Sequence, residues 1–164
     1  CLDHVVGEVL SDGHSHHINR LMVLANWGTL LGVEPEQLNH WFWVAFDDAY
    51  EWVVSPNVLG MGTYALGDLM VTKPYVSGSA YINKMSDYCS QCDFNPKTNC
   101  PMTRLYWNFL AAHEEKFSVN QRMNIVMGGL RKRSMEKRRV DAEVYQTVTH
   151  ALAKGRKLRP AEFQ

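Results

Sequence analysis

Residues 16 to 31 read HHINRLMVLANWGTLL, and this stretch sets the fold class. Its apolar and small side chains recur at spacings of three and four residues, at Ile18, Leu21, Met22, Ala25 and Gly28. That period is typical of an amphipathic α-helix and differs from the strict alternation of a half-buried strand. The sequence therefore predicts a helix from His16 to Leu31, with Gly32 as its stop signal.

A second helix is predicted from Pro35 to Val54, with the sequence PEQLNHWFWVAFDDAYEWVV. Proline is common at the first position of helices, and a helix of this length would run about 30 Å. We expect it to end at Ser55-Pro56, because proline disfavours helical backbone in the residue before it. Most of its tryptophans are expected in the core; they are Trp41, Trp43 and Trp52.

The segment from 56 to 88 is predicted to be irregular, since glycines interrupt it and few charges occur in it. A loop of this length in a compact domain usually serves a function or packs on a ligand. Helices are predicted again over residues 102–117, 120–127 and 135–154. Because no strand pattern occurs, the sequence predicts an all-α protein.

The composition limits the function classes. Lys and Arg number 17, as do Asp and Glu, so the whole chain gives no electrostatic argument for nucleic-acid binding. A local basic run is interpreted as a solvated helix face; its members are Arg131, Lys132, Arg133, Lys137, Arg138 and Arg139. No apolar run approaches the ~20 residues of a membrane span, so no membrane partner is expected.

The start of the chain and its few cysteines suggest a compartment. No signal-peptide pattern opens the sequence, and its first residue is Cys1 instead of Met. We therefore expect a piece of a longer protein. Four cysteines are few for a disulfide scaffold of this size, which favours a reducing cytoplasm and a metal or redox role.

All four cysteines are candidate metal ligands. Cys89 and Cys92 form a C-x-x-C pair, Cys100 follows directly before Pro101, and Cys1 lies far upstream. Iron–sulfur clusters take thiolate ligands, and a cysteine followed by proline is common in such ligand runs. Zinc also takes four cysteines, so the spacing alone leaves a cluster and zinc open. A thioredoxin-like redox pair is disfavoured, because it sits beside a βαβ unit.

Three long, irregular motifs carry a resemblance to a known family. They are SHHINRLM (15 to 22), WFWVAFDDAYEWVVSPNVLGM (41 to 61) and TKPYVSGSAYINKMSDYCSQC (72 to 92). Together they resemble the bacterial photolyase-related proteins that carry a 4Fe-4S cluster, a group that includes the prokaryotic (6-4) photolyases and related cryptochromes. The resemblance implies that residues 1–164 form the C-terminal part of the helical FAD and iron–sulfur catalytic domain, with a basic helical tail over about 131–164.

The resemblance assigns roles to two groups of residues. It implies that all four cysteines, Cys1, Cys89, Cys92 and Cys100, ligate the cluster. It matches His17 to the active-site histidine and makes His16 a neighbour that tunes or orients it. Without the resemblance, histidines at a helix start would be read as caps or as solvent-exposed groups.

The resemblance also implies flavin and DNA contacts. Trp41 matches the flavin-proximal tryptophan of an electron-transfer route, while Phe42 stands where a tyrosine often follows, which puts a tyrosine-radical step in question. Asp48, in the D-A-Y motif, matches an aspartate close to the flavin. The irregular segment is expected to line the flavin pocket through Asn57 and Met61 and to reach DNA phosphates through Lys73 and Lys84.

The expected function is light-driven repair of pyrimidine (6-4) photoproducts in UV-damaged DNA, by an FAD enzyme that flips the lesion out of the duplex. An antenna chromophore would lie in a preceding α/β domain, which is the expected partner of this chain. The chain alone is expected to bind FAD weakly or not at all. Two other functions stay open: a light-sensing cryptochrome of the same family, and a zinc-stapled helical module that contacts nucleic acid.

Overall fold

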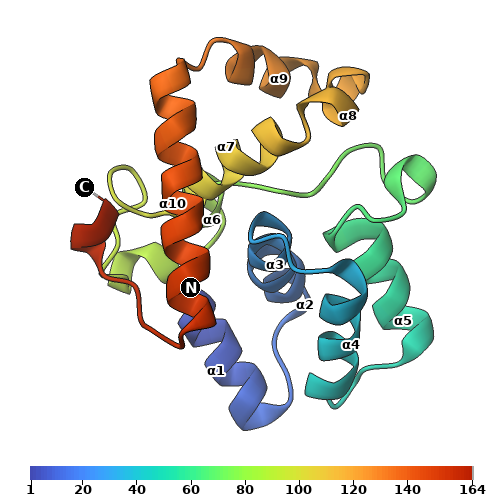
Figure 1. Cartoon of the computed structure of the whole chain (residues 1–164). Coiled ribbons are helices and arrows are strands. Elements are labelled where there is room, and N and C mark those ends of the chain that lie inside the picture. Colours follow the sequence, from blue (N-terminus) through green and yellow to red (C-terminus); the bar gives the residue numbers. More distant parts are fainter. Residues whose placement is uncertain (164) are drawn as a thin grey trace. The chain divides into compact units, whose positions relative to one another are not determined.

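The computed structural model describes residues 1–163, and all of its regular structure within that range is helical (Figure 1). The predicted all-α class is therefore confirmed. The chain divides into two compact units, of which the first covers Cys1–Val76 and the second begins at Ser77. Each unit is described by itself below.

The first unit begins with a helix that the sequence analysis missed. In chain order, its elements are α1 (Leu2–Asp12), α2 (His17–Asn19), the π-helix η1 (Arg20–Ala25), α3 (Asn26–Leu30), α4 (Pro35–Ala45), α5 (Glu51–Ser55), the π-helix η2 (Pro56–Gly62) and the 3-10 helix η3 (Gly67–Leu69). The core of the unit follows η1 and α3, where residues 22 to 30 are all buried. Val5 and Val9, one turn apart on α1, are buried as well.

The predicted helix from His16 to Leu31 is confirmed as one continuous helical path through α2, η1 and α3. Gly32 follows it with a φ of 71°, the left-handed backbone that glycine adopts without strain. The π-helical winding of η1 was not predicted, since a pattern of apolar spacings does not separate α from π turns. Such π stretches inside helices are frequent at functional sites.

The single helix predicted from Pro35 to Val54 is wrong. Helix α4 ends at Ala45, and the backbone is extended at Phe46 and again at Tyr50 before α5 begins. In the turn between these helices, the Asp47 amide donates a hydrogen bond of 2.8 Å to the carbonyl of Gly13. Tertiary contacts thus replace the helical bonds that the local pattern favoured.

The expected helix stop at Ser55-Pro56 is also wrong. Ser55 keeps helical dihedrals, and the chain continues from α5 into η2 at Pro56. Proline lacks the N–H of an α-helical bond and its ring crowds the carbonyl four residues before it. Pro56 is the first residue of the π-helical segment. The segment from 56 to 88, predicted to be irregular, therefore contains helical structure.

The expectation that most tryptophans of this region are core residues is wrong for two of them. Trp43 is 52% exposed and Trp52 is 78% exposed, while Trp41 is half-buried. Trp52 lies on α5, beyond the break, whereas Trp43 lies on α4 two residues after Trp41 and therefore on a different face of that helix.

The second unit is built around two packed helices. Its elements are α6 (Ser79–Met85), the 3-10 helix η4 (Tyr88–Gln91), α7 (Met102–Ala112), α8 (Glu114–Ser118), the 3-10 helix η5 (Gln121–Met123), α9 (Asn124–Arg131), α10 (Met135–Ala153) and the 3-10 helix η6 (Pro160–Phe163). Helix α10 packs against α7 (Figure 1), and Leu105, Leu110 and Val148 are fully buried. The helices predicted over 102–117 and 135–154 are confirmed, the first with a break at His113.

The basic run is only partly the solvated face that we expected. Arg131, Lys132, Lys137 and Arg139 are exposed, but Arg133 and Arg138 are half-buried and form ion pairs with Asp141 and Glu114. These two arginines hold the loop between α9 and α10 against the rest of the second unit. Within residues 1–163, no helix combines the length and the apolar character that crossing a bilayer requires.

Candidate functional site

A pocket in the first unit brings several predicted residues together. It has an empty volume of about 430 Å³, is open to solvent, and has a mainly apolar lining. Both π-helices contribute to it: Leu21 and Ala25 come from η1, and Asn57 and Val58 from η2. Its polar lining groups are His17, Arg20 and Asn57. The pocket therefore joins the predicted catalytic histidine to a predicted flavin-binding residue.

His16 and His17 have different structural positions. The Nδ1 atom of His16 accepts a hydrogen bond of 3.2 Å from the amide of Ile18, so His16 caps helix α2. His17 is the first residue of that helix and lines the pocket. Both side chains are exposed. The cap fixes the helix start and thereby the place of His17 at the pocket edge.

Arg20 is a residue of the site that the sequence analysis missed. Its Nε donates a hydrogen bond of 2.9 Å to the carbonyl of Ser15, and its Nη2 lies 2.8 Å from the carboxylate of Asp48. Its guanidinium also lies 4.2 Å from the centre of the Phe46 ring. The available signal was its spacing, because a residue three positions after His17 lies on the same helix face.

Asp48 does not line the pocket and reaches it through Arg20. The Asp48 side chain is 51% exposed, and that of Arg20 is 18% exposed. The hydrogen bond from Arg20 is the largest cause that lowers the pKa of Asp48 below its ordinary value, while partial burial acts in the opposite direction. Asp48 is therefore a carboxylate at neutral pH and fixes a guanidinium at the pocket.

Trp41 contacts the pocket through aromatic neighbours. Its ring meets Phe42 edge-on with 5.4 Å between ring centres, and Phe46 edge-on at 6.1 Å. Phe42 and Phe46 stack at 5.3 Å with an interplanar angle of 16°. Phe42 is buried and lines the pocket, whereas Trp41 does not. Trp41 thus lies one ring behind the pocket wall.

Asn57 and Met61 are both half-buried on η2, but only Asn57 lines the pocket. The Asn57 amide nitrogen donates a hydrogen bond of 2.7 Å to the carbonyl of Val53, which fixes the side-chain amide. The two π-helices can approach closely because Gly62 has no side chain: a Cβ there would lie 2.8 Å from the Cβ of Ala25.

The lining of the pocket is compatible in chemical character with part of a flavin. Apolar walls with a few fixed polar groups are typical of sites for planar ring systems. The residues of the first unit are thus suited to one portion of the cofactor, with Asn57 and Arg20 as the polar groups.

Three of the predicted metal ligands lie in the second unit. Cys89 belongs to η4, Cys92 follows that helix directly, and Cys100 ends the next loop; all three are half-buried free thiols. Burial is the largest cause that raises the pKa of Cys100, and negative charge on Cys92 and Cys89 adds to it. Burial is likewise the largest cause that raises the pKa of Cys89, and negative charge on Cys92 adds to it.

The loop that leads to Cys100 is held by asparagines. The carbonyl of Asn95 accepts hydrogen bonds from the amides of Thr98, Asn99 and Cys100. The side chain of Asn99 accepts a bond of 2.7 Å from the Asn95 amide, and that of Asn95 accepts one of 2.8 Å from Lys97. These bonds give the loop one conformation and position Cys100.

The cysteines match a cluster in donor chemistry but do not form a closed metal site. Thiolate-only donors suit iron–sulfur clusters and zinc. Among the described residues, no three His, Cys, Asp or Glu side chains are arranged to hold a metal ion. Cys1 precedes α1 in the first unit and is half-buried.

The predicted DNA contacts, Lys73 and Lys84, are both exposed. Lys73 lies in the loop after η3 and Lys84 in the last turn of α6, so they belong to different units.

Comparisons with known proteins give two relatives and no matching family model. The chain is 42% identical over 128 residues to a protein named (6-4) photolyase from Agrobacterium fabrum; the match covers 75% of this chain and 25% of that protein. It is also 33% identical over 96 residues to an uncharacterized protein of Acanthamoeba polyphaga mimivirus. That match covers 58% of this chain and 75% of the viral protein. The chain thus spans about a quarter of the length of the Agrobacterium relative.

Proposed function

We propose, from the premise that this chain belongs to the photolyase/cryptochrome family, that it is part of a light-driven DNA-repair enzyme. The substrate would be the pyrimidine (6-4) photoproduct in UV-damaged DNA. The observation that carries the proposal is the 42% identity, over 128 residues, to a protein named (6-4) photolyase.

The pocket of the first unit supports this proposal. Bound FAD would supply light-driven electron transfer to the lesion. Asn57 and the Arg20–Asp48 pair would hold part of the flavin, Met61 would pack close by, and Trp41 would pass electrons through the buried ring of Phe42. His17 would hold or donate a proton at the lesion, because the pKa of histidine is easily moved across neutral pH.

The four cysteines would hold a structural 4Fe-4S cluster in the same protein. Cys89, Cys92 and Cys100 are half-buried free thiols of the second unit, and Cys1 would be the fourth ligand. The support is the thiolate-only donor set and the fixed loop over 95–100. The cluster would tie the start of the chain to that loop.

Damaged DNA would reach the site through a flipped base, whose unstacking costs a few kcal/mol and less for a damaged pair. Lys73 and Lys84 would contact backbone phosphates, which position the duplex without reading its sequence. Their exposure supports this role. The antenna chromophore and the rest of the flavin pocket would belong to other parts of a longer, cytoplasmic protein.

A light-sensing cryptochrome is the second candidate function. The observation that favours it is Phe42, a buried side chain beside Trp41 that has no phenol group. The electron route through Trp41 would then differ from one in which a tyrosine follows, whereas His17 favours the repair function.

A repair assay on the natural full-length protein separates the two functions. Oligonucleotides with one (6-4) photoproduct, one cyclobutane dimer or no damage are incubated in blue light and in the dark, and the bases are analysed by chromatography. We expect restored pyrimidines only in the light and only from the (6-4) strand. A flavin-loaded protein that responds to light but restores neither lesion would support the cryptochrome and contradict the repair function.

A further inference from the structure

A second pocket, in the second unit, is lined by cations and plays no part in the proposed reaction. Its empty volume is about 680 Å³ and it is open to solvent. Four basic residues line it. Lys97 comes from the loop over 95–100 and Arg104 from α7. Arg133 lies in the loop before α10, and Lys137 lies in the first turns of α10. We call it the basic pocket below.

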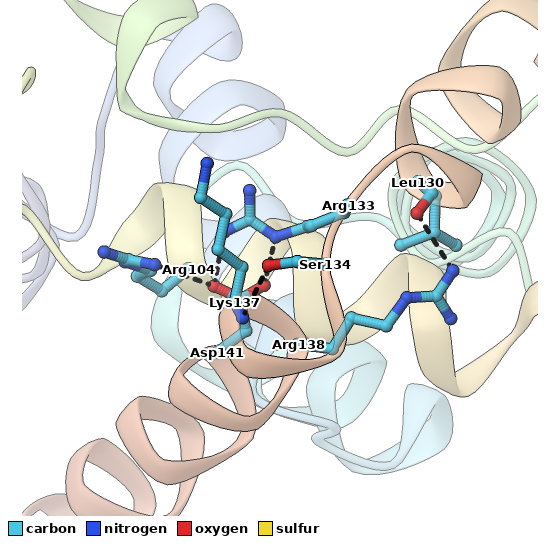
Figure 2. Close-up of polar contacts among 7 residues, drawn as sticks. All are labelled: Arg104, Leu130, Arg133, Ser134, Lys137, Arg138 and Asp141. Atoms are coloured by element: carbon cyan, nitrogen blue, oxygen red, sulfur yellow. Dashed lines mark hydrogen bonds and ion pairs between the residues drawn. The ribbon is translucent and has the colours of Figure 1, made fainter.

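One buried carboxylate balances part of this charge. Asp141, only 1% exposed, accepts bonds of 2.5 Å and 2.7 Å from Arg133, and Arg104 lies 3.4 Å from one of its oxygens. Figure 2 shows Arg104 and Arg133 joined to Asp141, while the side chain of Lys137, one helical turn earlier, extends away from that carboxylate. Four cations against one carboxylate leave an excess of three positive charges at the pocket.

The excess charge falls on Lys97, Lys137 and Arg104. Within the part of the chain that the structure describes, neither lysine has a carboxylate within 4.0 Å. Arg104 has only the long contact to Asp141 and is 39% exposed. Arg133 is held by Asp141 on one side and by the ring of Trp107 at 5.1 Å on the other. Arg133 is therefore fixed in place, and Lys97, Lys137 and Arg104 carry the charge that Asp141 does not balance.

The loop side of the pocket is also fixed. The Asn95 side chain bonds the amide of Lys97. The hydroxyl of Ser79 donates a bond of 2.6 Å to the carbonyl of Pro96 and lies 2.7 Å from the hydroxyl of Thr103. A cationic pocket whose walls are already ordered binds an anion without a large cost in conformational entropy.

We propose that the basic pocket binds a phosphate group. A tetrahedral dianion takes donors from several directions at once, which suits an arginine fork together with two lysines on different segments. The phosphate would come from a nucleic-acid backbone or from a small phosphorylated molecule. The proposal does not depend on the repair reaction, because neither flavin nor a damaged base takes part.

The test compares two ligands on the full chain at low salt. Inorganic phosphate is titrated by calorimetry, and a short, undamaged, fluorescein-labelled DNA strand by anisotropy, both in the dark. The variant combines Lys97→Gln and Lys137→Gln, two exposed residues whose loss removes no ion pair. The matched control combines Lys132→Gln and Lys157→Gln, which are exposed, remove the same charge and do not line the pocket.

We expect the pocket variant to weaken phosphate binding about tenfold, from two charge contacts of ordinary strength, and the control variant to leave it unchanged. If DNA binding falls as well, and the slope of log K against log salt concentration is lower by about 1 for each lost phosphate contact, the phosphate comes from a nucleic acid. If DNA binding stays the same, the source is a small phosphorylated molecule. No phosphate binding by the wild-type chain, or an equal loss in the control, would overturn the proposal. Neither result bears on light-driven repair.

Discussion

The guanidinium of Arg20 lies 2.8 Å from the carboxylate of Asp48, and it also covers the ring of Phe46 at 4.2 Å. This pair ties η1 to the turn that breaks the helix predicted over residues 35 to 54. Without it, Arg20 would keep only its bond to the Ser15 carbonyl and its contact with the Phe46 ring.

Asp48→Asn should destabilise the chain by at most about 1 kcal/mol at neutral pH, because the pair is partly exposed. Arg20 lowers the pKa of folded Asp48 below that of an unfolded aspartate. The ion pair therefore adds stability above pH about 4, and this stability is lost as the pH falls through the folded pKa. Urea unfolding of both proteins at neutral pH and at about pH 3 should show a difference that becomes smaller in acid.

Asp47→Asn is the control for this prediction. It removes the same charge one residue earlier, where the carboxylate makes no ion pair among the described residues. The control should unfold like the wild type at both pH values. An equal loss in the two variants would mean that general charge, and not the pair with Arg20, sets the stability.

Asp141→Asn should have a much larger effect, a loss of about 3 kcal/mol in the free energy of unfolding. Removing one partner of a buried ion pair leaves the other charge unpaired, and Asp141 is 1% exposed. Glu143→Gln, on the same helix, changes an exposed residue whose pair with Arg139 is 3.8 Å long, so it should cost less than about 0.5 kcal/mol. Urea unfolding measures both values, and similar losses would contradict the structural role of Asp141.

The sequence predicted the helices whose apolar spacing is regular over several turns, such as those over 135–154 and 16–31. It did not predict the break at Phe46, because that break depends on bonds to Gly13 and Arg20 that are distant in sequence. Helix α1 had local signals that were available, namely Val5 and Val9 four residues apart and Gly13 as a left-handed cap. The π-helices could not be predicted, because the spacing of apolar residues along the sequence does not separate α from π turns.

Gly62→Ala and Gly7→Ala should change stability in opposite directions. An alanine Cβ at residue 62 would lie 2.8 Å from the Cβ of Ala25 and 3.3 Å from the carbonyl of Asn57, neither of which moves easily. We expect a loss of about 1–3 kcal/mol from overpacking. At residue 7, inside α1, a Cβ meets nothing within 4 Å, so alanine should add about 0.5–1 kcal/mol through helix propensity. Thermal unfolding of the two variants would show the opposite signs, and two losses would mean that α1 is not the helix described.

Cys92→Ser should remove the cluster from the natural full-length protein, since serine is a poor ligand for iron–sulfur clusters. The wild-type protein, purified without oxygen, should contain iron and acid-labile sulfide and show a brown absorption that dithionite bleaches. Ser90→Ala changes an exposed residue between the two cysteines and should leave the iron content unaltered. Zinc in place of iron in the wild type would contradict the cluster and leave a zinc-stapled module.

The candidate site was predictable only in part. His17 and Asn57 meet in one pocket, as expected of residues around one cofactor, but Arg20 and Phe42 also line it and were not assigned to it. The C-x-x-C pair and Cys100 were predictable as neighbours because few residues separate them. The position of Cys1 relative to them depends on tertiary structure, which spacing along the chain does not determine.

His16 and His17 provide the sharpest test of the proposed chemistry, because their local roles differ. The ring of His16 caps α2 by accepting a bond from Ile18, and asparagine is also a good cap. His16→Asn should therefore keep the helix and keep most of the light-driven repair of a (6-4) oligonucleotide by the full-length protein.

His17→Asn keeps the helix start as well, but it removes the only imidazole that lines the described pocket. Losing a general acid typically lowers a rate about 10²–10⁴-fold, so repair should fall by that factor while flavin content and thermal unfolding stay the same. If repair falls equally in both variants, the histidines act as a unit; if His17→Asn repairs normally, His17 is not the proton donor and the catalytic part of the proposal is wrong.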